Sequence, residues 1–137
     1  MLLGKALSCM SDREHAKEIL ETARRDLRAL RAMHDVDAFP DEIFGFHAQQ
    51  SVEKALKAWL AFLGKEFPKT HDLKRLIDML RDGGISTDQM DSFVDLNAFA
   101  VQYRYESLYA NEEPVDRSEL ADSIELLIGQ VEAELRR

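Results

Sequence analysis

Residues 45–76, GFHAQQSVEKALKAWLAFLGKEFPKTHDLKRL, decide the fold because they contain one strongly patterned helix and the start of another. Apolar residues recur there at intervals of three and four, which is the spacing of a core-facing helix stripe. Counted from just before the stretch, the stripe comprises Ile43, Phe44, Ala48, Val52, Ala55, Leu56, Trp59, Leu60 and Leu63. Gly64 can end this helix, and Thr70 can cap a second one that begins with His71 and Asp72. The stretch therefore predicts two consecutive helices joined by a short loop.

A column of polar residues occupies the opposite side of the first of these helices. At about 100° per residue, its four members fall within roughly an 80° sector. This polar column comprises His47, Gln50, Lys54 and Lys57. Two ammonium groups, an amide and an imidazole are suited to bind a phosphate group or an acidic partner, and a merely solvated helix face is the alternative. Glu53, at the edge of the column, is expected to pair with Lys57 four residues further on.

Composition predicts one domain. The chain has 137 residues, 45% of them apolar, which suffices for one core and is too short for two ordinary domains. Residues 1–137 are expected to form this domain, with residues 1–10 either included or a loosely ordered N-terminal segment.

With 18 basic and 26 acidic residues the net charge is -8, so only a local basic patch would attract a polyanion. The single Cys9 excludes an intrachain disulfide, and the first ten residues make a poor signal peptide, so a cytoplasmic protein is expected.

Helical periodicity also continues on both sides of the opening stretch. Four further helix boundaries are marked by Ser11 with Glu14, by Gly83 with Gly84, by Ser86 with Gln89, and by Asp116 with Glu119. The first helix is predicted over about residues 12–34, antiparallel to the helix that carries the polar column. No alternating strand pattern competes with these helices. An all-α, up-and-down bundle of four to five helices is therefore expected.

Three segments carry a family resemblance. They are FHAQQSVEKALKAWL at residues 46–60, THDL at residues 70–73, and the tripeptide Tyr103-Arg104-Tyr105. On these segments the chain resembles the HEPN family, the higher eukaryotes and prokaryotes nucleotide-binding domains, over most of its length. Many relatives have a proline after the Arg-Tyr pair, where this chain has Glu106. The resemblance implies a helical domain whose function concerns nucleotides or RNA.

The resemblance implies two functions of different kinds. Metal-independent RNases of the family use an arginine followed, after four to six residues, by a histidine, and no histidine follows Arg104 in this chain. The match between Arg28 and His34 puts its two side chains about 120° apart on a continuous helix, too far to share one phosphate easily. The chain looks more like the branch that pairs with a separately encoded minimal nucleotidyltransferase in a toxin-antitoxin-like arrangement. We therefore expect a nucleotide-binding or RNA-binding partner of such an enzyme, without independent catalysis.

Two alternatives remain open: a metal-independent RNase with an atypical site, and a purely structural helical interaction module. The expected ligand-binding residues are His47, Gln50, Lys54, Lys57, His71, Asp72, Arg104 and Tyr105. The candidates for catalysis, if RNA is cleaved, are His47, His71 and Arg104. A metal-dependent phosphohydrolase using His47, His71, Asp72 and Asp95 is disfavoured, because a carboxylate such as Asp72 is also expected in the first turn of a helix. No metal and no cofactor is expected.

The expected partners follow from these functions. They are a nucleotide or RNA, a minimal nucleotidyltransferase encoded nearby, and a second copy of the chain, whereas no membrane is expected. The homodimer is predicted because the last helix has apolar residues on more than one side, Leu127 and Ile128 included.

Overall fold

The structure is a computed structural model, and it describes the backbone of residues 2–102 and 114–137 and the side chains of residues 12–100 and 114–137. Its elements, in chain order, are α1 (Leu2–Ala32), α2 (Asp41–Phe62), α3 (Leu73–Asp82), the 3-10 helix η1 (Asp88–Leu96), α4 (Asn97–Gln102) and α5 (Arg117–Leu135). The described backbone contains no strand. The prediction of an all-α fold is therefore confirmed.

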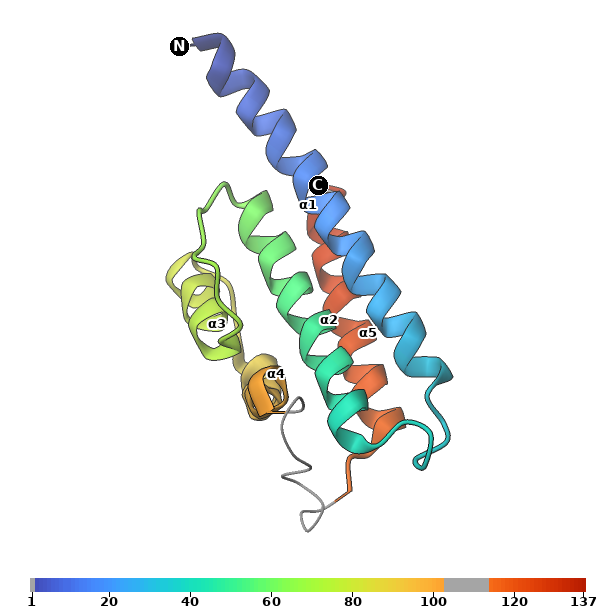
Figure 1. Cartoon of the computed structure of the whole chain (residues 1–137). Coiled ribbons are helices and arrows are strands. Elements are labelled where there is room, and N and C mark those ends of the chain that lie inside the picture. Colours follow the sequence, from blue (N-terminus) through green and yellow to red (C-terminus); the bar gives the residue numbers. More distant parts are fainter. Residues whose placement is uncertain (1, 103–113) are drawn as a thin grey trace.

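Helix α2 lies at the centre of the molecule and contacts every other element (Figure 1). The long helices α1 and α5 pack on one side of it, while α3, η1 and α4 pack on the other. Helix α1 runs antiparallel to α2, as predicted, and its N-terminal turns extend beyond the other helices. Whatever polar residues α2 presents between its two sets of neighbours can thus be reached by groups from both sets.

The core explains why α2 is so regular. Its apolar stripe is buried as predicted from Phe44 to Leu60, including Trp59 with only 6% of its surface exposed. Ile43 is only partly buried, and Leu63, just beyond the end of the helix, is 36% exposed. Gly45 lies directly against the Phe99 ring of α4, because a Cβ atom at Gly45 would come within 2.5 Å of that ring. In α5, Leu127 and Ile128 are 2% and 4% exposed, so both face the core. These two residues therefore offer no surface to a second copy, whereas Leu126 on the same helix is 73% exposed. The homodimer remains a prediction.

Arg117, the first residue of α5, joins three parts of the fold. Its guanidinium donates to the carbonyl oxygens of Met33 and Phe39 in the connection between α1 and α2. It also pairs with the Asp41 carboxylate at 2.9 Å and lies 4.8 Å from the centroid of the Phe44 ring. These contacts place the starts of α2 and α5 side by side, so the two helices run in the same direction.

Several helix boundaries are confirmed. Gly64 and Gly84 have φ angles of +71° and +92°, and they follow the ends of α2 and α3. Asp116 caps α5, because its carboxylate accepts from the backbone N–H of Glu119 at 3.1 Å. In each case a residue type with a specific backbone preference ends or starts the helix.

Three other boundary predictions are wrong. Helix α1 begins at Leu2 and ends at Ala32, so Ser11 and Glu14 lie inside it, and the good helix formers before them override the capping signal. Asp72, and not Thr70, caps α3 by accepting from the backbone N–H of Lys74 at 3.0 Å. The predicted capping box of Ser86 with Gln89 is replaced by a 3-10 helix whose preceding residue, Thr87, makes no side-chain cap bond.

Candidate functional site

The carboxylate of Glu53, on α2, is buried and binds three donors. Its side chain is only 6% exposed. Oε1 accepts from Gln49 Nε2 at 3.0 Å and from His71 Nδ1 at 2.8 Å, and Oε2 accepts from Lys57 Nζ at 2.9 Å. We call these four residues the Glu53 cluster. It joins the polar side of α2 to the connection between α2 and α3.

Helix periodicity and one buried amide explain how the cluster forms. Gln49, Glu53 and Lys57 follow one another at intervals of four residues, so they lie on one face of α2. Gln49 is completely buried, and its Nε2 also donates to the backbone carbonyl of His71 at 3.0 Å. Gln50 Nε2 in turn donates to Gln49 Oε1 at 2.7 Å. His71 is therefore bound to α2 through its ring and through its backbone.

The ionisation of Glu53 follows from these contacts. Burial by itself raises the pKa of this carboxyl, because the charged form loses its hydration. Hydrogen bonds from Lys57, Gln49 and His71 outweigh that effect and leave the pKa below its ordinary value. Glu53 is accordingly an anion at neutral pH, and this buried anion orients the three donor groups that it binds.

His71 combines this orientation with exposure. A carboxylate can only accept, so Nδ1 carries the proton that it shares with Glu53. The side chain is nonetheless 65% exposed, and the other ring nitrogen, Nε2, lies on the opposite side of the ring from Nδ1. Neutral His71 therefore presents a lone pair at Nε2, and the imidazolium presents an N–H there.

A second carboxylate, that of Asp26 on α1, binds the rest of the polar column. Lys54 Nζ donates to Asp26 Oδ2 at 2.7 Å, and His47 Nδ1 lies 3.4 Å from Oδ1. The side chain of Asp26 is 15% exposed. The polar column is thus divided, with His47 and Lys54 bound to Asp26 on α1 and Lys57 bound to Glu53 on α2. Neither lysine extends freely into solvent.

Comparison with known proteins adds the family to this geometry. A family model described as HEPN domain matches residues 16–133, which is most of the chain. The chain belongs to the HEPN family. No curated protein and no solved structure matches it. Membership of the HEPN family supports a function related to nucleotides or RNA.

Within this HEPN domain, the structure brings together only some of the predicted site residues. Lys57 and His71 meet at Glu53, and Gln50 reaches them through Gln49. Arg104 and Tyr105 lie outside the described residues. Gln49 and Glu53 were not among the predicted ligand-binding residues, although their four-residue spacing is visible in the sequence. What the spacing does not show is that the chain returns at His71 to complete the cluster.

Asp72, next to His71, contributes to the fold of the HEPN domain. Its Oδ1 accepts from the backbone of Lys74 and, at 2.9 Å, from Asn97 Nδ2. Asn97 Oδ1 accepts from the backbone N–H of Leu73 at 2.8 Å, so Asp72 and Asn97 join the start of α3 to the start of α4. These contacts fix the backbone on the C-terminal side of His71.

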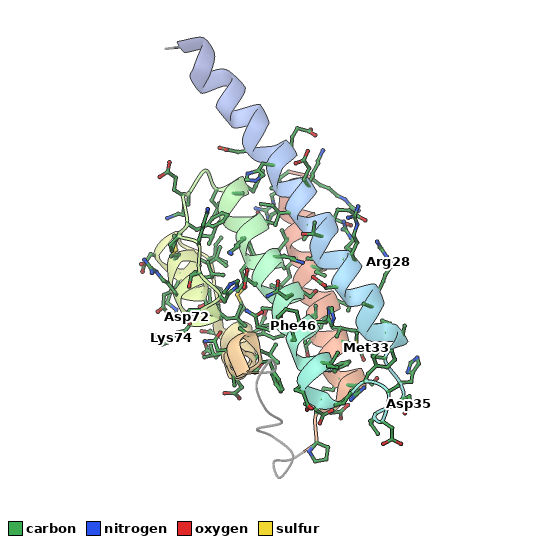
Figure 2. All side chains as sticks on the ribbon, viewed as in Figure 1. Arg28, Met33, Asp35, Phe46, Asp72 and Lys74 are labelled. Atoms are coloured by element: carbon green, nitrogen blue, oxygen red, sulfur yellow. The ribbon has the colours of Figure 1, made fainter. Side chains whose placement is uncertain are left out.

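The residues considered for the alternative enzymes are dispersed. Arg28 lies on α1, on the other side of the molecule from Asp72 and Lys74, and binds Glu21 at 3.3 Å (Figure 2). His34 lies beyond the end of that helix. Among the side chains described, no group of three or more His, Cys, Asp or Glu residues is arranged to bind a metal ion.

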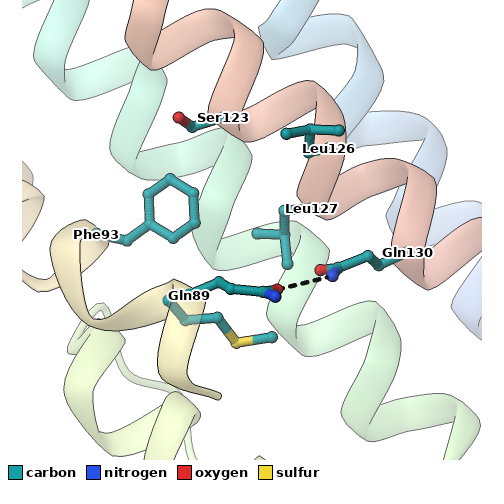
Figure 3. A pocket seen from close by; sticks show the side chains of 7 residues that line it. Gln89, Phe93, Ser123, Leu126, Leu127 and Gln130 are labelled. Atoms are coloured by element: carbon teal, nitrogen blue, oxygen red, sulfur yellow. Dashed lines mark hydrogen bonds between the residues drawn. The ribbon is translucent and has the colours of Figure 1, made fainter. Parts of the chain in front are cut away.

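A separate groove lies between η1 and α5 (Figure 3). It has a volume of about 460 Å³ and is lined by Gln89, Met90, Phe93, Ser123, Leu126, Leu127 and Gln130. Gln89 Oε1 accepts from Gln130 Nε2 at 3.0 Å across it. No charged residue lines the groove. It therefore lacks the cations that a phosphate group requires.

No helix in the described part of the chain has the length and hydropathy needed to cross a membrane.

Proposed function

We propose that this HEPN protein binds a nucleotide or RNA at the Glu53 cluster, as the non-catalytic partner of a minimal nucleotidyltransferase in a toxin-antitoxin-like pair. One observation supports the site above all: a buried anion binds a lysine and an exposed histidine on the same surface. Family membership supports the class of ligand, since HEPN domains have functions related to nucleotides or RNA.

Lys57 retains donor capacity in this arrangement. Its ion pair with Glu53 uses one of three N–H bonds of the ammonium group. The side chain is 17% exposed, and Nζ lies 5.8 Å from the centroid of the Phe67 ring. Two fixed partners reduce the side-chain entropy that Lys57 would lose on binding a ligand. A phosphate oxygen would therefore meet an ammonium group that is already ordered.

Binding is favoured over cleavage for a reason in the sequence. The RNase motif that the family resemblance implies does not follow Arg104.

One feature favours an atypical RNase as the second candidate, because an imidazole oriented by a buried carboxylate is also the arrangement of a general base. Under the binding proposal, purified protein leaves single-stranded RNA intact in the presence of a chelator. Metal-independent cleavage that disappears with His71→Ala would support the RNase instead.

The first prediction tests the site with matched lysine variants. Lys57→Gln should weaken binding of ATP or of a short RNA at least about tenfold, because loss of a charge-assisted contact costs roughly 1.5 to 3 kcal/mol. Lys17→Gln is the control, since Lys17 lies on α1 and is 54% exposed. Fluorescence titration of the three proteins measures the affinities, and circular dichroism confirms the fold. Equal affinities for the wild type and Lys57→Gln would contradict the proposed site.

The partner proposal needs its own measurement. If a small nucleotidyltransferase is encoded beside this protein, the two should copurify when expressed together. Lys57→Gln tests whether the partner binds at the Glu53 cluster. If it does, Lys57→Gln should copurify poorly with the partner, whereas Lys17→Gln should copurify as the wild type does. Absence of a complex at tens of micromolar would contradict the pairing while leaving nucleotide binding to be judged by titration.

A further inference from the structure

We infer that His71, positioned by Glu53, recognises phosphate in this site together with Lys57, and that it binds phosphate only as the imidazolium. The inference rests on the proposed function and deepens it. Its ligand chemistry is a phosphate group, supplied either by a free nucleotide or by the backbone of RNA. Glu53 is then a positioning residue, since it contacts His71 and not the ligand.

Geometry provides the first step. The imidazole ring of His71 is bound at Nδ1 by Glu53 at 2.8 Å, and its backbone carbonyl is bound by Gln49 at 3.0 Å. Both bonds go to buried side chains of α2, which have 5% and 0% of their residue surfaces exposed. The ring is therefore restrained on its inner edge while 65% of the side chain is exposed. The outer edge, which carries Nε2, is available to a ligand.

Charge provides the second step. Residues 41–82 comprise α2, the connection and α3, and their charges balance while His71 is neutral. The seven anions are Asp41, Glu42, Glu53, Glu66, Asp72, Asp78 and Asp82, and the seven cations are Lys54, Lys57, Lys65, Lys69, Lys74, Arg75 and Arg81. The chain as a whole carries a net charge of -8, which repels a phosphate. A proton on His71 gives this segment a net positive charge.

Hydrogen-bond polarity provides the third step. With Nδ1–H donated to Glu53, neutral His71 has only a lone pair at Nε2, and a phosphate oxygen is also an acceptor. Protonation converts Nε2 into a charged donor, which is the stronger kind of hydrogen-bond donor to phosphate. The pKa of Glu53 is lowered from 4.5, so Glu53 stays ionised between pH 5 and pH 8 and keeps accepting from Nδ1–H.

The experiment compares binding at pH 6 and pH 8 for the wild type and two histidine variants. His71→Asn retains an amide N–H near the position of Nδ1 but has no group in place of Nε2. His15→Asn is the control, because His15 is an exposed histidine on α1. Labelled ATP and a short single-stranded RNA are the two probes. RNA phosphodiesters do not titrate in this range, whereas a terminal phosphate does, so the RNA series isolates the protein's contribution.

We expect the wild type and His15→Asn to bind RNA about tenfold or more tightly at pH 6 than at pH 8. His71→Asn should bind at pH 6 no better than the wild type does at pH 8. The ATP affinities are corrected for the pH response that His71→Asn retains. If the corrected affinity for ATP, but not the affinity for RNA, is higher at pH 6 than at pH 8, the phosphate source is a free nucleotide. Binding that is independent of pH, or a pH response that survives in His71→Asn, overturns this inference but leaves the proposed function intact. Absence of binding by the wild type at both pH values overturns both.

A second measurement does not depend on a variant that folds. NMR of the wild-type protein follows the imidazole carbon and proton shifts of His71 from pH 5 to pH 8, with and without the probe that binds. A bound phosphate should raise the midpoint of the His71 titration and leave that of His15 unchanged. An unchanged midpoint for His71 under saturating probe overturns the inference.

Discussion

At the scale of single residues, Glu53 combines a buried position with a negative charge, so its protonation affects the stability of the fold. The pKa of Glu53 is lowered in the folded protein, because hydrogen bonds from Lys57, Gln49 and His71 outweigh the burial that raises it. A lowered pKa means that the unfolded state binds the proton more readily. The stabilising contribution of Glu53 is therefore complete above about pH 4.5 and is lost as the pH falls through the folded-state pKa.

The corresponding prediction concerns Glu53→Gln. This variant should be less stable than the wild type by about 1 to 3 kcal/mol at pH 7, because Lys57 and His71 lose a charged acceptor. It should also lose less stability than the wild type between pH 5 and pH 3. Urea unfolding at several pH values measures both effects. Parallel pH profiles for the two proteins would show that the carboxylate contributes nothing through its charge.

The residues of the site also show where sequence patterns stop being informative. The pairing of Glu53 with Lys57 was predicted from a four-residue spacing and is confirmed at 2.9 Å. The contact between Glu53 and His71 spans 18 positions and depends on the path of the chain between α2 and α3. From the sequence, the two lysines of the polar column could be phosphate ligands or part of a solvated face. In the structure each lysine forms an ion pair with a nearby carboxylate, Lys54 with Asp26 and Lys57 with Glu53. The sequence pattern did not indicate the pairing of Lys54 with Asp26.

At the scale of elements, the contact between α2 and α4 depends on a glycine. A methyl group at Gly45 would overlap the Phe99 ring at 2.5 Å, so Gly45→Ala should lower the free energy of unfolding by about 1 to 3 kcal/mol. Gly129→Ala is the matched control on α5, because nothing lies within 4 Å of its added Cβ and alanine favours the helix by about 0.5 to 1 kcal/mol. Chemical denaturation compares them. A neutral effect of Gly45→Ala would contradict the described packing of α4.

The helix-boundary signals in the sequence differed in how well they predicted the ends of the elements. Gly64 and Gly84 adopt positive φ angles, and Asp116 caps α5, so these signals gave the correct boundaries. The pair Ser11 and Glu14 gave a wrong boundary, because both residue types also occur within helices and nothing in the sequence interrupts α1 there. The 3-10 geometry of η1 was not predicted either, since its apolar spacing of three residues fits both kinds of helix.

At the scale of the whole molecule, the fold class and the family followed from the sequence, whereas self-association remains a prediction. Leu127 and Ile128, which were named for it, are buried in the core, but Leu126 leaves an exposed apolar side chain on the same helix, 73% exposed beside the uncharged groove. We expect the protein to sediment as a dimer at tens of micromolar, with a monomer fraction that increases on dilution. A strictly monomeric profile over the same concentrations would contradict the homodimer.

The most direct test of the central claim is NMR mapping of the ligand site on the whole molecule. Uniformly ¹⁵N-labelled protein is titrated at pH 6 with ATP and, separately, with a short RNA. The account predicts that the largest shift changes fall on residues 53–57 and 69–73, which include the Glu53 cluster and the start of α3. Changes concentrated instead on Gln89, Ser123 and Gln130 around the groove, or no changes with either ligand, would contradict it.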